Sequence, residues 1–309
     1  MSVLLLADHD NGVLSPATAR LVAASSALGV VDILVVAENP ASIAAEAAKI
    51  AGVQKVITVT ATPIAETITN SLEDLTQRYR NVVASASSVG KDVIPRLAAK
   101  LDIQPVTDVV EILGPNRFTR PIYAGNALET VEDPQATHLL TFRASAFRPA
   151  ASGNNAPVES LDISVTSAAK FLAAHRTDSD TPDLATAQIV IGGGVSVGSA
   201  EGFQLIEKLG KTLGAAVGAT RAAVDAGYAP NDWQIGQTGK IIAPDLYIAI
   251  GISGALQHLA GIQGAKKIFA INSDPEAPLV KIADVALIGD LFEIVPQLVT
   301  ELERLGLKR

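Results

Sequence analysis

The feature that most restricts the fold of this chain is a regular alternation of short, β-branched apolar runs with alanine-rich stretches of helical periodicity. Residues 2–8 (SVLLLAD) and 30–38 (VVDILVVAE) are typical of buried strands, and residues 15–29 between them are typical of a helix. A helix between two strands returns the chain to the same end of the sheet, so the strands pair in parallel. The sequence therefore predicts an α/β fold class with mostly parallel sheets and flanking helices.

The alternation is interrupted once and then resumes, which indicates two domains. Residues 104–143 contain strand-like runs without helices between them, and we expect antiparallel strands that extend the first sheet. Residues 144–186 are rich in Ser, Pro, Asn and Asp and lack strand periodicity, with one short helix expected near 166–175. We therefore predict an N-terminal α/β domain with extra antiparallel strands at 1–143, a connector at 144–186 and a doubly wound α/β domain at 187–309.

Composition narrows the classes of function. The 309-residue chain has a net charge of −8 and no cluster of Lys and Arg, which argues against a nucleic-acid-binding surface. It has no cysteine, which removes thiol nucleophiles, disulfides and cysteine-ligated metal sites. The N-terminal segment has no basic leader, and no apolar run reaches the ~18 residues of a membrane span. We expect a protein of the bacterial cytoplasm without direct membrane insertion.

Glycine-rich or polar loops follow the predicted strands of the second domain, at 192–199, 218–227, 234–240, 251–258, 271–274 and 288–292. Ligands of open α/β sheets bind beyond the carboxyl ends of the strands, and glycine lets backbone amides approach a phosphate closely. The first loop is not a clean G-x-G-x-x-G and no P-loop is present, so spacing does not identify the nucleotide. That loop alone could equally be a tight strand–helix connection. Together the loops predict a nucleotide-type ligand.

Longer motifs in the same region carry a resemblance to a known family. They are RAAVDAG directly after Thr220, QIGQTGK at 234–240, PDLYIAIGISGALQHLAG at 244–261, AINSDPEAP at 270–278 and GDLF at 289–292, with RPIYAGNA at 120–127 in the first domain. With these motifs the chain resembles the α subunit of electron-transfer flavoprotein. The resemblance implies a FAD-binding C-terminal domain and a heterodimer with a β subunit that carries AMP.

The resemblance also implies which residues contact FAD. Thr238 is expected near flavin N5, His258 at the pyrimidine oxygen and Arg221 over the ring. Ser253 and the turn through Gln257 are expected to hold the pyrophosphate and ribityl chain. Asn272 and Asp290 are expected to hold the adenosine end of FAD. No catalytic residue and no metal ligand is expected. The full expected set is Gly194, Thr220, Arg221, Gln234, Ile235, Gly236, Gln237, Thr238, Ser253, Gly254, Ala255, Leu256, Gln257, His258, Asn272, Asp290 and Leu291.

One loop departs from the family's motif. Family members usually read GGRG at the first glycine turn, whereas this chain reads GGGVSVGS at 192–199, one residue longer and without the arginine. An arginine placed at Gly194 is therefore expected to tighten FAD binding.

Structural roles also remain open for several expected FAD contacts. His258 could be a helix-interior ring whose nitrogens a neighbour satisfies. Arg221 could pair with Asp225 one helical turn later, and Asp290 could cap a helix.

The function implied by the resemblance is that of an electron carrier rather than an enzyme. The chain would accept electrons from acyl-CoA and related dehydrogenases, as in fatty acid β-oxidation, and pass them to a membrane electron-transfer flavoprotein–quinone oxidoreductase. The competing hypothesis is a FAD- or NAD-dependent enzyme subunit that uses the same nucleotide-binding domain, and a third is a flavin-storage or structural subunit. An enzyme should show an acid/base group or substrate pocket besides the cofactor site, and the sequence displays neither.

Overall fold

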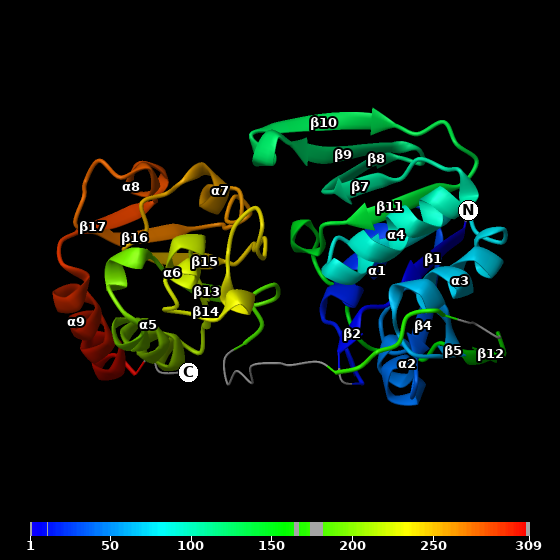
Figure 1. Cartoon of the computed structure of the whole chain (residues 1–309), viewed down its shortest axis with the longest axis horizontal. Coiled ribbons are helices and arrows are strands. Elements are labelled where there is room, and N and C mark those ends of the chain that lie inside the picture. Colours follow the sequence, from blue (N-terminus) through cyan, green and yellow to red (C-terminus); the bar gives the residue numbers. More distant parts are fainter. Residues whose placement is uncertain (1, 11, 164–166, 174–181, 307–309) are drawn as a thin grey trace. The chain divides into compact units, whose positions relative to one another are not determined.

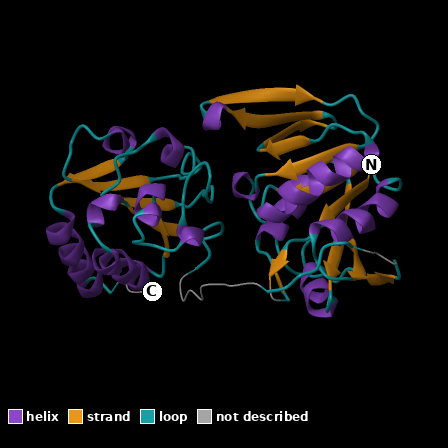
Figure 2. Ribbon diagram, in the orientation of Figure 1, coloured by secondary structure: helices purple, strands orange, loops and turns teal. Residues whose placement is uncertain are grey.

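The computed structural model describes residues 2–10, 12–163, 167–173 and 182–306 (Figure 1). These residues form two compact units. Unit 1 is built from the described residues within 1–123 and 127–174, and unit 2 from those within 124–126 and 175–309. Each unit is an α/β layer structure with helices packed on a mostly parallel sheet (Figure 2). The predicted fold class is confirmed.

Unit 1 is organised around a seven-stranded sheet in the order β12-β5-β4-β1-β6-β11-β7. Its strands all pair in parallel and are β1 (Ser2–Leu6), β4 (Val30–Ala37), β5 (Val53–Thr60), β6 (Asn81–Ser85), β7 (Val106–Val109), β11 (His138–Phe142) and β12 (Val158–Leu161). Its helices are α1 (Ala17–Ser25), α2 (Ala41–Ala47), α3 (Ala65–Thr76) and α4 (Ser88–Leu101). A short antiparallel pair joins β2 (His9–Asp10) and β3 (Val13–Leu14).

Alternating side chains of the central strands explain why helices cover both faces of this sheet. Val3 and Leu5 of β1 belong to the apolar cluster that contains the buried residues of α1 and α2. Leu4 and Leu6 belong to the cluster on the other face, with the buried residues of α3 and α4. Successive side chains of a strand point to opposite faces, so a continuous apolar run such as SVLLL needs a covering layer on each side.

The expectation for 104–143 is confirmed for the antiparallel strands but wrong for the sheet that they join. β7 and β11 join the first sheet in parallel, while β8 (Glu111–Gly114), β9 (Arg117–Ile122) and β10 (Ala127–Glu132) form a separate three-stranded antiparallel sheet. The burial of the strands gives the physical reason. All residues of β11 are buried, as an inner parallel strand requires, whereas β10 alternates between partly buried and exposed positions, as a sheet with one solvent face requires.

The expected connector at 144–186 also differs from the structure in its first half. β12 lies inside it and forms the edge of the first sheet by pairing with β5. The short helix expected near 166–175 falls partly outside the described residues, and its described part, 167–173, is not helical. The proposed domain boundaries at 143 and 187 stay a prediction.

Unit 2 contains a five-stranded parallel sheet in the order β14-β13-β15-β16-β17. Its strands are β13 (Ile189–Gly193), β14 (Ala216–Ala219), β15 (Leu246–Ile250), β16 (Ile268–Asn272) and β17 (Val285–Ile288). Its helices are α5 (Ala200–Leu213), α6 (Arg221–Asp225), α7 (Leu256–Leu259), α8 (Pro278–Ile282) and α9 (Leu291–Arg304). Residues of α5 and α9, including Phe203 and Val295, pack on one face of this sheet, and a second cluster around Tyr247, Ile242 and Leu279 covers the other.

The strand order places a change of direction in the middle of this sheet. From β13 the chain passes through α5 to β14 on one side, and it later returns to β15 on the other side of β13. The loops that leave β13 and β15 therefore diverge, and a crevice opens between them at the carboxyl ends of the strands. Open α/β sheets bind their ligands at this position.

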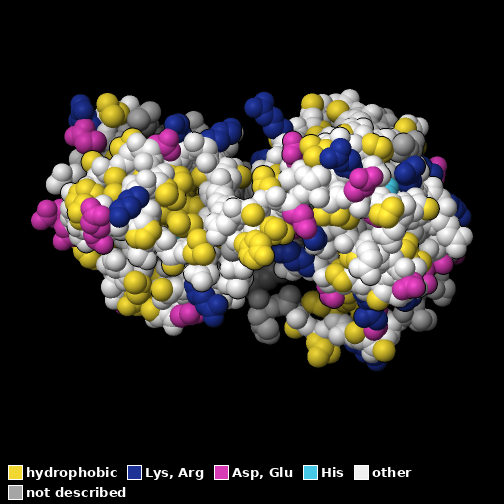
Figure 3. Space-filling model, turned by 90° about the horizontal axis from the view of Figure 1, so that it is seen from above, with side chains coloured by type: hydrophobic (Ala, Val, Ile, Leu, Met, Phe, Trp, Pro, Cys, Tyr) yellow, Lys and Arg dark blue, Asp and Glu magenta, His cyan; other side chains and the backbone are white. Residues whose placement is uncertain are grey.

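The surface and the helices add two observations. On the face drawn in Figure 3, Lys and Arg side chains are interspersed with Asp and Glu rather than gathered in one patch. Among the described residues, no helix is both long enough and apolar enough to cross a membrane.

Candidate functional site

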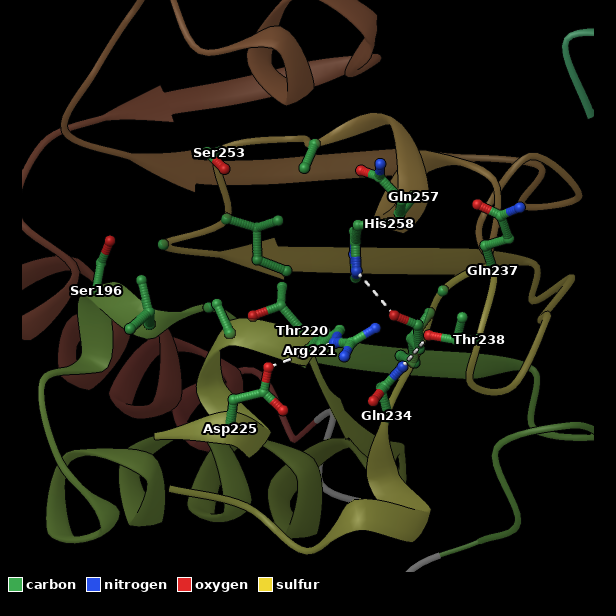
Figure 4. A pocket seen from close by; sticks show the side chains of 18 residues that line it. Ser196, Thr220, Arg221, Asp225, Gln234, Gln237, Thr238, Ser253, Gln257 and His258 are labelled. Atoms are coloured by element: carbon green, nitrogen blue, oxygen red, sulfur yellow. Dashed lines mark hydrogen bonds and ion pairs between the residues drawn. The ribbon is translucent and has the colours of Figure 1, made fainter. Parts of the chain in front are cut away.

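A cavity of about 440 Å³ opens at the crevice between β13 and β15 (Figure 4). Four loops that follow strands β13, β14 and β15 form its wall. The lining residues are Gly194, Val195, Ser196, Thr220, Arg221, Ala222, Asp225, Gln234, Ile235, Gly236, Gln237, Thr238, Gly251, Ile252, Ser253, Ala255, Gln257 and His258. Pockets for small molecules and cofactors have volumes of roughly 300–1,000 Å³ and combine apolar walls with a few polar groups, which fits this cavity.

Glycine at the ends of β13 and β15 lets two backbone segments cross at the floor of the cavity. A Cβ atom on Gly194 would lie 1.9 Å from the carbonyl oxygen of Gly251. Gly251 itself has φ +61°, a left-handed conformation that side chains with a Cβ disfavour. The expectation that an arginine at Gly194 would tighten cofactor binding is therefore wrong for this loop, because any side chain there collides with backbone.

The loop at 234–240 is held by backbone hydrogen bonds to its neighbours. The amide of Ile235 donates to Ala219 O at 2.9 Å, and the amide of Gln237 donates to Gln257 O at 2.8 Å. Within the loop, Gln234 Nε2 donates to Thr238 Oγ1 at 2.9 Å. Because that oxygen acts as the acceptor, the hydroxyl hydrogen of Thr238 remains available for an acceptor in the cavity.

His258 lies in the cavity wall, but both of its ring nitrogens contact the chain. Its side chain is buried, with 6% exposure. Nδ1 lies 3.1 Å from Ile235 O, and Nε2 lies 2.8 Å from the hydroxyl of Tyr247. Burial lowers the pKa of His258 to about 4, against a smaller opposite effect of the Ile235 carbonyl. The imidazole is therefore neutral near pH 7. In this arrangement Nδ1 faces Ile235 O and Nε2 faces the Tyr247 hydroxyl, and the direct hydrogen bond expected from His258 to a flavin oxygen stays a prediction.

Arg221 is the cationic side chain of the cavity wall, and it is mostly exposed. Its Nε lies 3.4 Å from Asp225 Oδ2, and the two side chains are 67% and 63% exposed. The pairing of Arg221 with Asp225 considered from their spacing is confirmed. Thr220 precedes them as the N-cap of α6, where its hydroxyl accepts from the amide of Ala223 at 3.3 Å. An exposed pair of this kind can exchange its partner for an anionic ligand at little cost.

The structure brings most of the expected FAD contacts to this cavity but leaves some outside its lining. Those outside are Gly254, Leu256, Asn272, Asp290 and Leu291. Asn272 Nδ2 donates to Ile252 O at 2.9 Å, so this side chain supports the loop after β15. Asp290 is the N-cap of α9 and accepts a hydrogen bond from the amide of Phe292 at 2.8 Å, which is the structural role considered for it from the sequence. Leu291 is buried.

Several lining residues were absent from the expected set, namely Val195, Ser196, Ala222, Asp225, Gly251 and Ile252. All except Asp225 lie within two residues of an expected residue in the same loop, and the sequence indicates Asp225 only as the ion-pair partner of Arg221. Their positions could have been found by taking each strand-end loop as a unit. Within the described part of the chain, no group of three or more His, Asp or Glu side chains is arranged to hold a metal ion.

Comparisons with known proteins match both units. Residues 3–166 match the family model of the electron transfer flavoprotein domain, and residues 183–263 match that of the electron transfer flavoprotein FAD-binding domain. The electron transfer flavoprotein subunit alpha of Paracoccus denitrificans is 47% identical over 98% of this chain and 100% of its own length. That of Pseudomonas aeruginosa is 44% identical over 96% and 99%. The mitochondrial subunit of Arabidopsis thaliana is 43% identical over 98% and 90%.

Proposed function

The chain belongs to the electron transfer flavoprotein family as an alpha subunit, and from this premise we propose that it is the FAD-carrying half of a two-subunit electron carrier. One observation of the structure carries the proposal. The cavity lies where the loops of β13 and β15 diverge, inside the segment that matches the FAD-binding domain.

The residues of the cavity fit a flavin nucleotide. Hydroxyl and amide side chains that are exposed here and line the wall, such as Ser196, Ser253 and Gln257, supply donors for a ribityl chain and a pyrophosphate. Thr238 keeps a hydroxyl hydrogen for an acceptor such as a flavin ring nitrogen. Arg221 supplies positive charge at the same cavity. Bound FAD would supply the one- and two-electron chemistry, and these side chains would bind and orient it.

The roles proposed for individual residues follow from these positions. We propose that Thr238 donates to the flavin ring, that Arg221 faces its charged edge, and that Ser253 contacts the pyrophosphate. Asn272 and Asp290 would hold the adenosine end of FAD, and each also makes a hydrogen bond to backbone that fixes its own loop.

The partners are proposed from the family. A β subunit carrying AMP would complete a heterodimer, acyl-CoA and related dehydrogenases would donate electrons, and a membrane electron-transfer flavoprotein–quinone oxidoreductase would accept them. Unit 2 has apolar side chains that would favour a protein partner. Ile282, Val285, Ile288 and Phe292 are each 48–56% exposed around the edge strand β17. A place in fatty acid β-oxidation and a location in the bacterial cytoplasm remain predictions.

The rival is a FAD- or NAD-dependent enzyme subunit. The cavity wall contains three ionisable side chains, those of Arg221, Asp225 and His258. Asp225 is paired with Arg221, and both ring nitrogens of His258 contact other groups of the chain. None of them is poised as a general acid or base, which favours a carrier over an enzyme.

A cavity-filling variant tests the proposal. Ser253 is exposed and lines the cavity, and Ser273 is exposed on the loop after β16 and does not line it. We expect Ser253→Trp, co-expressed with the family's β subunit, to assemble but to lose most of its FAD absorbance. Ser273→Trp should keep it. The wild-type complex should be reduced by an acyl-CoA dehydrogenase with its substrate, yet should turn over no small substrate alone. Equal FAD content in both variants would contradict the proposed site.

A further inference from the structure

We propose that Tyr247 is a positioning residue of the cavity: its hydroxyl donates to Nε2 of His258 and thereby holds the ring in the orientation in which Nδ1–H fixes the carbonyl of Ile235. The consequence for FAD rests on the proposed function, whereas the hydrogen-bonded chain itself does not.

The chemistry of the three groups determines which of them donates each hydrogen bond. A backbone carbonyl only accepts, so Nδ1 of His258, 3.1 Å from Ile235 O, must carry a hydrogen. In a neutral ring Nε2 then has a lone pair, and the Tyr247 hydroxyl 2.8 Å away donates to it. Burial raises the pKa of Tyr247 above its usual value and lowers that of His258. Both shifts keep the phenol protonated and the imidazole neutral.

The surroundings of Tyr247 direct its hydroxyl to one partner among the described residues. Its side chain has 0% exposure, so the hydroxyl does not contact bulk solvent, and it lies 2.8 Å from His258 Nε2. A Cβ atom on Gly192 would lie 2.0 Å from that hydroxyl oxygen. Glycine at the end of β13 therefore leaves the space that the phenol fills. Packing against Tyr247 therefore explains why position 192 is glycine, independently of any role in phosphate binding.

The hydrogen-bonded chain links three elements around the cavity. Tyr247 stands on β15, His258 on α7, and Ile235 on the loop that also carries Thr238. Only one further hydrogen bond between that loop and α7 is found in the described structure, from the Gln237 amide to Gln257 O. The His258 ring therefore supplies one of the two hydrogen bonds that hold the Thr238 loop against α7.

Removing the phenol hydroxyl should loosen the ring. In Tyr247→Phe, Nε2 would be buried without a donor. The Ile235 carbonyl would still require the hydrogen on Nδ1, but that hydrogen bond alone would then hold the orientation of the ring. The ring and the 234–240 loop that it contacts should therefore become more mobile.

Nitrogen-15 NMR of histidine-labelled protein tests the proposal in the full complex with the β subunit. The chain has four histidines, and the His258 signals are assigned with His258→Asn. Wild-type His258 should show the neutral Nδ1–H tautomer at pH 7, with and without FAD. A wild-type ring that is cationic, or that carries its hydrogen on Nε2, would overturn the proposal without any variant.

Two matched variants complete the test. Tyr247→Phe should change the nitrogen-15 shift of His258 Nε2, which loses its donor, raise the pKa of His258 and weaken FAD binding by about three- to tenfold. Tyr228→Phe, a partly buried tyrosine of the same unit that does not line the cavity, should change none of these. An unchanged Nε2 shift and pKa in Tyr247→Phe would overturn the proposal. If the wild-type complex binds no FAD while the Nε2 shift still changes, the proposed function fails and the role of Tyr247 stands.

Discussion

Two buried histidines, one in each unit, show how the partner rather than the burial decides what a histidine does. His138 of β11 has 0% exposure and His258 of α7 has 6%. Each points Nδ1 at an oxygen, at 2.7 Å for His138 and 3.1 Å for His258. For His138 that oxygen belongs to the carboxylate of Asp133, and for His258 it belongs to a backbone carbonyl.

The difference in partner gives the two sites different electrostatics. Burial alone would raise the pKa of Asp133, but hydrogen bonds from His138 and Gln135 hold it below its usual value, so the carboxylate is ionised. This group ties the segment after β10 to the first residue of β11. His258 has two neutral partners and contributes an uncharged wall to the cavity. We therefore expect His138 to act on stability alone and His258 to act on the cofactor site.

The largest effect is expected from removing the ionised carboxylate of Asp133. Asp133→Ala leaves the buried Nδ1–H of His138 without its acceptor and removes two hydrogen bonds from Gln135, which should lower the free energy of unfolding by about 3–5 kcal/mol. Urea unfolding followed by circular dichroism measures this loss. FAD content per folded complex should stay at the wild-type level. The matched control, Asp74→Ala on the exposed face of α3, should cost less than about 0.5 kcal/mol.

The same pair should also respond to acid. Since its pKa is lower in the folded chain than in the unfolded chain, Asp133 stabilises the fold above the unfolded pKa near 4 and loses this contribution as the pH falls through the folded value. The unfolding free energy of Asp133→Ala should therefore converge on that of the wild type below that pH. A constant difference at all pH values would contradict an ionised Asp133.

The second effect concerns the neutral histidine. The pKa of His258 falls from 6.5 to about 4 on folding. Between these two pH values the unfolded chain therefore binds a proton on His258 that the folded chain does not bind. The stability of the FAD-free chain should therefore fall as the pH drops from about 6.5 to 4, by up to about 3 kcal/mol from this residue. In His258→Asn that part of the slope should disappear. Equal slopes in both chains would mean that His258 titrates normally.

The sequence could predict the sheets because their strands are marked locally. Continuous β-branched runs identify the buried strands, and the glycine-rich strand ends indicate where the cavity lies. Antiparallel strands were predicted within 104–143, but not that β8, β9 and β10 form a sheet of their own while β7 and β11 join the first sheet, because the sheet that a strand joins is set by packing over long sequence separations.

The roles of side chains in the site were less predictable for a related reason. Asn272 and Asp290 sit at strand ends, where a side chain can contact a ligand, the chain's own backbone or both. The structure shows a hydrogen bond to backbone for each, and their contacts to the cofactor stay a prediction. The state of His258 depends on Tyr247 and Ile235, 11 and 23 residues away. The sequence alone could not show that position 194 has no room for an arginine side chain. The backbone of Gly251 would collide with it, and only the fold brings these two residues together.

The smallest expected effect separates the cationic Arg221 from the neutral His258 of the same cavity. Arg221 is exposed and paired with Asp225, so its charge is screened by solvent and salt, whereas His258 carries no charge to screen. Asp225→Asn releases Arg221 for the anionic cofactor and should tighten FAD binding by about two- to fivefold at low ionic strength. The gain should vanish near 1 M salt, where the Debye length is about 3 Å.

The salt series is the control that makes this comparison decisive. Titration of FAD-free complex with FAD at low and high salt gives the affinity of the wild type and of Asp225→Asn. Tyr247→Phe, measured alongside, should lose affinity by the same factor at both salt concentrations, because a buried neutral hydrogen bond is not screened. If the effect of Asp225→Asn persists in high salt, Asp225 shapes the cavity wall sterically. If the effect of Tyr247→Phe fades with salt, the His258 ring is charged in the complex, and the contrast between a screened cation and a neutral wall no longer holds.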